Sequence, residues 1–186
     1  MKLNVPNLLT LIRIVLIPLV VIAFFLPFSW GRPLSAWLFV IAGVTDYFDG
    51  YLARRLNQTS SFGAFLDPVA DKLIVSTALV LLVQGDPRFT LAVVAGIIIG
   101  REITVSALRE WMAEIGARAH VAVSMFGKLK TTAQIVGISM MLYQHDLFAI
   151  PTYEVGAICL LIAAALTIWS MIGYLRAAWP VIRARG

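Results

Sequence analysis

Residues 46–71 read DYFDGYLARRLNQTSSFGAFLDPVAD, and this stretch carries four carboxylates in an otherwise apolar chain. The first pair, Asp46 and Asp49, is spaced by three residues. The second pair, Asp67 and Asp71, is spaced by four, and both spacings place two side chains on one face of a helix. The polar segment RRLNQTSS between the pairs is typical of a loop that turns one helix back on another. We therefore predict a helical hairpin that brings the four carboxylates together.

These carboxylates have the ligand chemistry of a magnesium or manganese site. Hard divalent cations bind oxygen ligands, and Mg²⁺ commonly binds through a few carboxylates together with substrate phosphates. Gly50, Ala53 and Gly63 stand between the acids, and their small or missing side chains leave room for a ligand near the backbone. The pattern predicts metal-dependent phosphate chemistry.

The acidic stretch has two alternative roles that compete with a metal site. The acids could only cap helices or pair with Arg54, Arg55 and Lys72, although such pairing would not explain the glycines. Ionisable residues within a membrane also mark ion pathways, so a transporter is the rival from another functional class. The two halves of the sequence show no repeated interrupted helices of the kind found in many transporters, which favours an enzyme.

The composition places this stretch in a membrane protein. Of the 186 residues, 60% are hydrophobic and only 13% are charged. A transmembrane helix needs about 20 mainly apolar residues. Runs of this kind cover residues 8–28, 33–52, 67–84, 89–110, 127–144 and 151–175. We predict an all-α, polytopic membrane protein with six transmembrane helices, a short interfacial N-terminal segment and a single domain over residues 1–186.

The basic residues predict the orientation of these helices. The formal net charge is +5, and with six spans one side of the membrane receives more of the positive groups than the other. The short connections on the opposite side carry Arg32 and Arg88. By the positive-inside rule, the more basic side faces the cytoplasm. It carries Lys2, Arg54, Arg55, Arg118, Lys128, Arg183 and Arg185.

The spacing D-x2-D-G-x2-A-R-x8-G-x3-D-x3-D is complete within residues 46–71, and it resembles the signature of the CDP-alcohol phosphotransferases. The segments NVPNLLTLIR, REITVSALREWMAEIG and VSMFGKLKTTAQ are similar to bacterial members of that family that use glycerol phosphate as the acceptor. The resemblance covers nearly the whole chain. It implies transfer of a phosphatidyl group from CDP-diacylglycerol to sn-glycerol 3-phosphate, with release of CMP. The signature alone does not choose among acceptors, so inositol phosphate and serine stay open.

The resemblance also assigns roles to residues of this chain. It implies that two Mg²⁺ or Mn²⁺ ions are held by Asp46, Asp49, Asp67 and Asp71. Asp71 is also expected to accept the proton of the attacking alcohol. Gly50, Arg54 and Gly63 are expected on the nucleotide side. A homodimer in the bacterial cytoplasmic membrane, with its active site facing the cytoplasm, completes the expectation.

Because the implied acceptor carries a phosphate, a basic pocket is expected near the metals. Arg101 lies within the fourth apolar run, where a lone cation is costly unless it has a partner. Pairing with Glu102 or Glu110, or attraction to anionic lipid headgroups, is the structural alternative. The full set of candidates for the acceptor phosphate is Arg101, Arg109, Lys128 and Lys130.

A polar stripe in the first apolar run is a further candidate for the pocket. Asn7, Thr10 and Arg13 recur at three-residue spacing and are therefore expected on one face of a helix. This face could point toward the pocket or serve helix packing, and the sequence favours neither.

Overall fold

The computed structural model describes the backbone of residues 5–55, 61–116, 125–147 and 150–185. Within these ranges, side chains are left undescribed at residues 5–6, 46–55, 61–62, 64, 125–128 and 184–185. The helices are α1 (Val5–Phe25), α2 (Gly31–Arg55), α3 (Ser61–Gly85), α4 (Phe89–Glu114), α5 (Met125–Tyr143) and α6 (Thr152–Arg185). Apart from one isolated bridge between Leu147 and Ile150, the described residues form no β-structure. The predicted all-α fold is confirmed.

Each of the six predicted apolar runs corresponds to one helix. The largest differences are at the start of α3, at Ser61 rather than residue 67, and at the end of α6, at Arg185 rather than residue 175. A hydropathy pattern marks only the apolar part of a helix, so polar helical turns beyond it are missed. Among the described residues, three segments are long and apolar enough to cross a membrane: Asn7–Phe25, Phe89–Glu114 and Thr152–Arg183. Spans at α2, α3 and α5 stay predictions, and the predicted interfacial segment before α1 lies outside the described residues.

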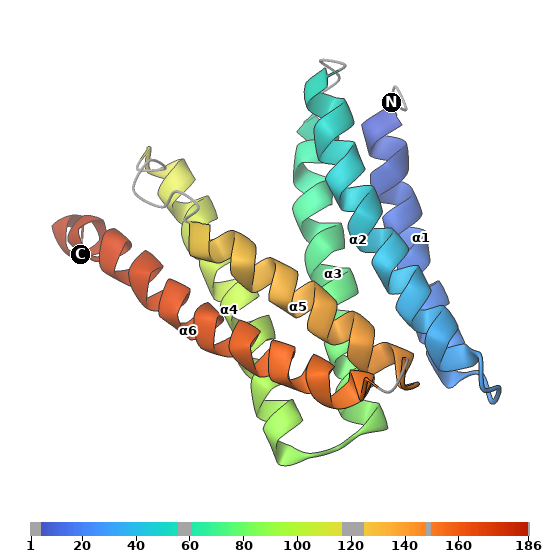
Figure 1. Ribbon diagram of the computed structural model, residues 1–186. Coiled ribbons are helices and arrows are strands. Elements are labelled where there is room, and N and C mark those ends of the chain that lie inside the picture. Colours follow the sequence, from blue (N-terminus) through green and yellow to red (C-terminus); the bar gives the residue numbers. More distant parts are fainter. Residues whose placement is uncertain (1–4, 56–60, 117–124, 148–149, 186) are drawn as a thin grey trace.

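The helices form two groups that meet along α2, α3, α4 and α5. In the first group α1 packs along α2 and also contacts α3, while in the second α6 packs along α5 and contacts α4. Contacts of α2 with α5 and of α3 with α4 join the two groups. Successive helices run in opposite directions, so the end of α2 and the start of α3 lie together at the upper end of the bundle in Figure 1. The predicted antiparallel hairpin is therefore present in the backbone.

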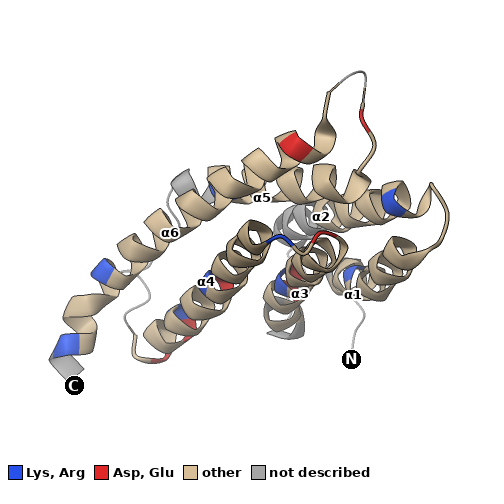
Figure 2. Cartoon of the chain, turned by 90° about the horizontal axis from the view of Figure 1, so that it is seen from below, with Lys and Arg blue, Asp and Glu red and all other residues tan. Residues whose placement is uncertain are grey.

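The interior is mainly apolar, with a smaller set of buried polar side chains. Val20, Leu82 and Leu142 belong to a single buried apolar cluster. Thr10 and Arg101 are among the polar residues that are also buried. Most of the ribbon carries no charge, and the charged residues of α3 and α4 are visible in Figure 2. Burial of a polar side chain is costly unless it has a partner, so these residues are candidates for contact with a polar ligand.

Helices α5 and α6 cross with their backbones in contact. A Cβ atom added to Gly137 would lie 2.9 Å from the carbonyl oxygen of Gly156, and one added to Gly156 would lie 2.9 Å from the carbonyl oxygen of Gly137. Small residues allow this close approach between helices in a membrane. The two glycines therefore fix the spacing of α5 and α6.

At the lower end, a polar contact ties the α3–α4 connection to the start of α6. Asp86 accepts hydrogen bonds from Nε of Arg88, at 2.9 and 2.7 Å to its two oxygens, and one from the hydroxyl of Tyr153. The guanidinium of Arg88 also lies over the Tyr153 ring, 5.5 Å from its centroid. The hydrogen bonds from Arg88, followed by that from Tyr153, hold the pKa of Asp86 below its ordinary value.

Candidate active site

Two of the four signature carboxylates, Asp67 and Asp71, are described, and they lie one turn apart on α3. Asp67 is half-buried and accepts a hydrogen bond from the hydroxyl of Thr10 on α1. Asp71 is exposed and lines a cavity between helices. The α1 stripe of Asn7, Thr10 and Arg13 is buried, and Thr10 connects it directly to Asp67.

The other signature residues lie on the facing turns of the hairpin. Asp46, Asp49, Gly50 and Arg54 belong to the last turns of α2, and their side chains lie outside the described residues. Gly63 is buried in the first turn of α3. No group of three or more potential ligands is found among the described side chains, which include only half of the predicted set. The metal site therefore stays a prediction, and its oxygen-only donor set is the kind that Mg²⁺ and Mn²⁺ bind.

A basic cavity of about 190 Å³ opens between α3, α4, α5 and α6. It brings together Asp71 and three of the four candidates for the acceptor phosphate. Its walls carry four cations and two carboxylates, so it has a formal excess of two positive charges, which matches a phosphate monoester dianion. Lys128, the fourth candidate, is in the first turn of α5, and its side chain lies outside the described set. The lining residues are Asp71, Lys72, Val75, Arg101, Glu102, Arg109, Lys130, Thr131, Gln134, Ile135 and Tyr174.

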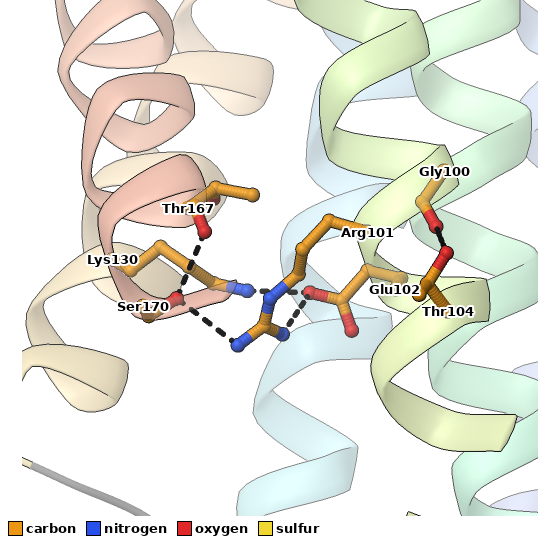
Figure 3. Close-up of polar contacts among 7 residues, drawn as sticks. All are labelled: Gly100, Arg101, Glu102, Thr104, Lys130, Thr167 and Ser170. Carbon is orange, nitrogen blue, oxygen red and sulfur yellow. Dashed lines mark hydrogen bonds and ion pairs between the residues drawn. The ribbon is translucent and has the colours of Figure 1, made fainter. Parts of the chain in front are cut away.

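Glu102 holds two of these cations in place (Figure 3). Its Oε1 accepts from Nη1 of Arg101 at 3.1 Å and from Nζ of Lys130 at 2.5 Å. Arg101 and Lys130 are buried, with exposed fractions of 8% and 3%. The pairing of Arg101 with Glu102 that the sequence left open is therefore present, whereas Glu110 is exposed. One carboxylate shared by two cations leaves positive charge available for a ligand.

Helix α6 supplies the remaining support for Arg101. Nη2 of Arg101 donates to Oγ of Ser170 at 3.2 Å, and Ser170 donates to the carbonyl oxygen of Thr167 at 3.0 Å. The guanidinium also lies 5.4 Å from the centroid of the Tyr174 ring. Contacts from α4 and α6 thus fix the position of the Arg101 charge, and Lys130 on α5 shares its partner Glu102 (Figure 3).

Sequence reasoning missed several residues that line this cavity or hold Arg101 in place. Gln134 is a polar residue within an apolar run, and it follows Lys130 by four positions, so helical spacing could have placed it on the same face. Ser170 and Tyr174 on α6 carried no comparable signal, because only tertiary packing brings α6 to Arg101.

A cationic cavity beside paired helix carboxylates, in a helical membrane protein, has the polar groups that a membrane-embedded enzyme of phosphate-group transfer needs. Residues 3–169 match the family model of the CDP-alcohol phosphatidyltransferases. The chain belongs to this family.

Curated relatives resemble the chain over nearly its whole length. It is 51% identical over 179 residues to a protein of Salmonella choleraesuis, with 96% of each chain covered. It is 53% identical over 178 residues to one of Pectobacterium atrosepticum, again with 96% of each chain covered. For a protein of Haemophilus influenzae, the identity is 53% over 179 residues, covering 96% of this chain and 95% of the relative. All three are named CDP-diacylglycerol–glycerol-3-phosphate 3-phosphatidyltransferase.

Proposed function

We propose that this chain is a phosphatidylglycerophosphate synthase, which transfers the phosphatidyl group of CDP-diacylglycerol to sn-glycerol 3-phosphate and releases CMP. The observation that carries the proposal is the identity of 51–53%, over 96% of the chain, to relatives named for this reaction. The basic cavity supports it, because its excess of positive charge suits an acceptor that carries a phosphate.

For the donor side, the proposed ligands of two divalent ions, Mg²⁺ or Mn²⁺, are Asp46, Asp49, Asp67 and Asp71. When bound, such ions neutralise pyrophosphate charge and stabilise the entering and leaving oxygens of an in-line displacement. Thr10 supports this assignment, since its hydrogen bond fixes the orientation of Asp67. The proposed contacts to the nucleotide come from Gly50, Arg54 and Gly63.

For the acceptor side, Arg101, Arg109, Lys128 and Lys130 bind the phosphate of sn-glycerol 3-phosphate. Asp71 lines the same cavity as three of them, so the bound acceptor lies close to a carboxylate that can take its proton. As Asp71 removes the proton of the primary hydroxyl, that oxygen forms a bond to the phosphorus attached to diacylglycerol. The bond from this phosphorus to the CMP oxygen breaks, and CMP leaves with the electron pair. Holding both reactants at one site supplies much of the rate enhancement.

An acceptor panel tests this proposal. Purified protein in detergent micelles is given CDP-diacylglycerol with sn-glycerol 3-phosphate, inositol phosphate or serine, and CMP and lipid product are measured together. We expect phosphatidylglycerol phosphate from the first acceptor alone, no turnover in a chelator, and recovery with Mg²⁺ or Mn²⁺. Efficient use of another acceptor would overturn the substrate assignment, and full activity in the chelator would overturn the metal assignment.

The proposed location is the bacterial inner membrane, with six spans and the basic cavity at the cytoplasmic face. The cationic bias of the connections on that side supports this orientation. Single cysteines at Gln58 and Ala117 in a Cys159→Ala background should react with a reagent applied from the cytoplasm, and cysteines at Asp86 and Asp146 with one applied from outside. The reverse pattern would contradict the orientation. The proposed homodimer is testable by crosslinking in the same membranes.

A further inference from the structure

Gln134 is a buried polar residue of the basic cavity whose acceptor atom lacks a donor. Its side chain is on α5, and the residue is 4% exposed. Within the described part of the chain, Oε1 of Gln134 has no hydrogen-bond partner. A buried polar atom left unpaired costs about 1–3 kcal/mol. Such an atom in the wall of a ligand cavity indicates a group that the ligand supplies.

Arg101, which lines the same cavity, has a donor atom that lacks an acceptor in the described part of the chain. Its Nη1 and Nη2 atoms have partners, but its buried Nε has no acceptor among the described residues. A phosphate dianion can accept from Nε, but it has no proton to give to Gln134. A hydroxyl group can donate and accept. The described part of the cavity therefore has one unpaired acceptor and one unpaired donor, and an alcohol next to the phosphate can pair with both.

We propose that Gln134 determines acceptor specificity by accepting a hydrogen bond from the secondary hydroxyl of sn-glycerol 3-phosphate. This inference rests on the proposed function. The primary hydroxyl gives its proton to Asp71, so the secondary hydroxyl is the donor that remains. Arg101 and Lys130 cannot accept a hydrogen bond, and Oε1 of Glu102 is already occupied by both. Among the buried side chains that line the cavity, Gln134 is the uncharged one, and its Oε1 lacks a donor among the described residues.

A comparison of two acceptors isolates this contact. The compound 3-hydroxypropyl phosphate keeps the primary hydroxyl and the phosphate of sn-glycerol 3-phosphate but lacks the secondary hydroxyl. We expect the wild type to prefer sn-glycerol 3-phosphate by about tenfold to a hundredfold in kcat/KM, as for one buried hydrogen bond. Gln134→Met, which keeps the length of the side chain, should lose this preference. Its kcat/KM should fall for sn-glycerol 3-phosphate and stay within about twofold for the deoxy acceptor.

Two further variants complete the experiment. Gln134→Glu keeps an acceptor oxygen, so it should retain the preference even if its added charge weakens both acceptors equally. Gln84→Met makes the same change as Gln134→Met at an exposed position near the end of α3, and it should leave the preference unchanged.

The outcomes separate this inference from the proposed function. Equal losses for both acceptors in Gln134→Met would give Gln134 a purely structural role and overturn the inference. A wild type that does not discriminate between the acceptors would overturn it as well, whatever the variants do. If the wild type makes no lipid product from either acceptor, the proposed function itself fails.

Discussion

Replacing Glu102 with alanine should destabilise the protein more than replacing either cation that it binds. In Arg101→Ala or Lys130→Ala, Glu102 keeps its other partner, so no buried charge is left alone. In Glu102→Ala, both cations lose their carboxylate at once. The order of stability losses follows from this asymmetry and not from the number of hydrogen bonds removed.

The size of the effect depends on how well water can replace the carboxylate. Breaking a fully buried ion pair by removing one partner costs about 3–5 kcal/mol. The Glu102 side chain is 25% exposed, and Arg101 keeps its contact with Ser170, so the cavity can admit water to the stranded cations. We expect roughly half of the full penalty, or about 2 kcal/mol. For a chain of this length, that lowers Tm by about 4–8 °C.

Thermal unfolding in detergent, followed by circular dichroism, measures this difference. Glu110→Ala is the matched control, since Glu110 is an exposed glutamate on the same helix and its loss should change Tm little. The double variant Glu102→Ala/Lys130→Met should recover part of the stability, because it removes one stranded charge. A Tm of Glu102→Ala equal to that of Glu110→Ala would refute the reasoning.

The signature, the helix crossing and the lower-end contact each lead to one further expectation. Asp71→Asn should leave Tm nearly unchanged but reduce CMP release by about a hundredfold to ten-thousandfold, as for loss of a general base; normal turnover would exclude that role. Gly137→Ala should lower the stability by about 1–3 kcal/mol through overpacking, whereas Gly96→Ala, where an added Cβ meets nothing within 4 Å, should not. The lowered pKa of Asp86 beside Arg88 adds stability that is complete above the ordinary value of 3.8 and is lost as the pH falls below it. The Tm difference between wild type and Asp86→Asn should therefore stay constant from pH 7 to about pH 5 and shrink below about pH 4, and a difference that shrinks near neutral pH would contradict this.

The helices were predictable because the features that determine them, a long apolar run and polar residues at a turn, are local in the sequence. A run such as 89–110 is apolar and long enough to form one helix, and the polar residues between the acid pairs indicate the turn between α2 and α3. The sharing of Glu102 between Arg101 and Lys130 was not predictable, because it depends on how α4 packs against α5. For the same reason, several partners for Arg101 were compatible with the sequence, and the structure selects one of them.

The same distinction between local spacing and tertiary packing applies to the candidate site. Spacing placed Asp67 and Asp71 on one helix face, and the structure adds that Asp71 shares a cavity with Arg101 and Lys130. The converging positions of Asp46 and Asp49 stay a prediction, since their side chains lie outside the described residues. The contribution of α6 to the cavity required the folded bundle, because an apolar helix carries no sign of which neighbour it will meet.

The contact between Gly137 and Gly156 also restricts how this protein can evolve. Most pairs of packed residues can exchange volume, because a larger side chain on one helix is offset by a smaller one on the other. Here both partners are already glycine, so no compensating substitution is available. A sequence change at either position would have to be accommodated by a new crossing of α5 and α6, and that would move Lys130 relative to Ser170. Natural variation at this crossing is therefore coupled to the geometry of the basic cavity, although neither glycine lines it.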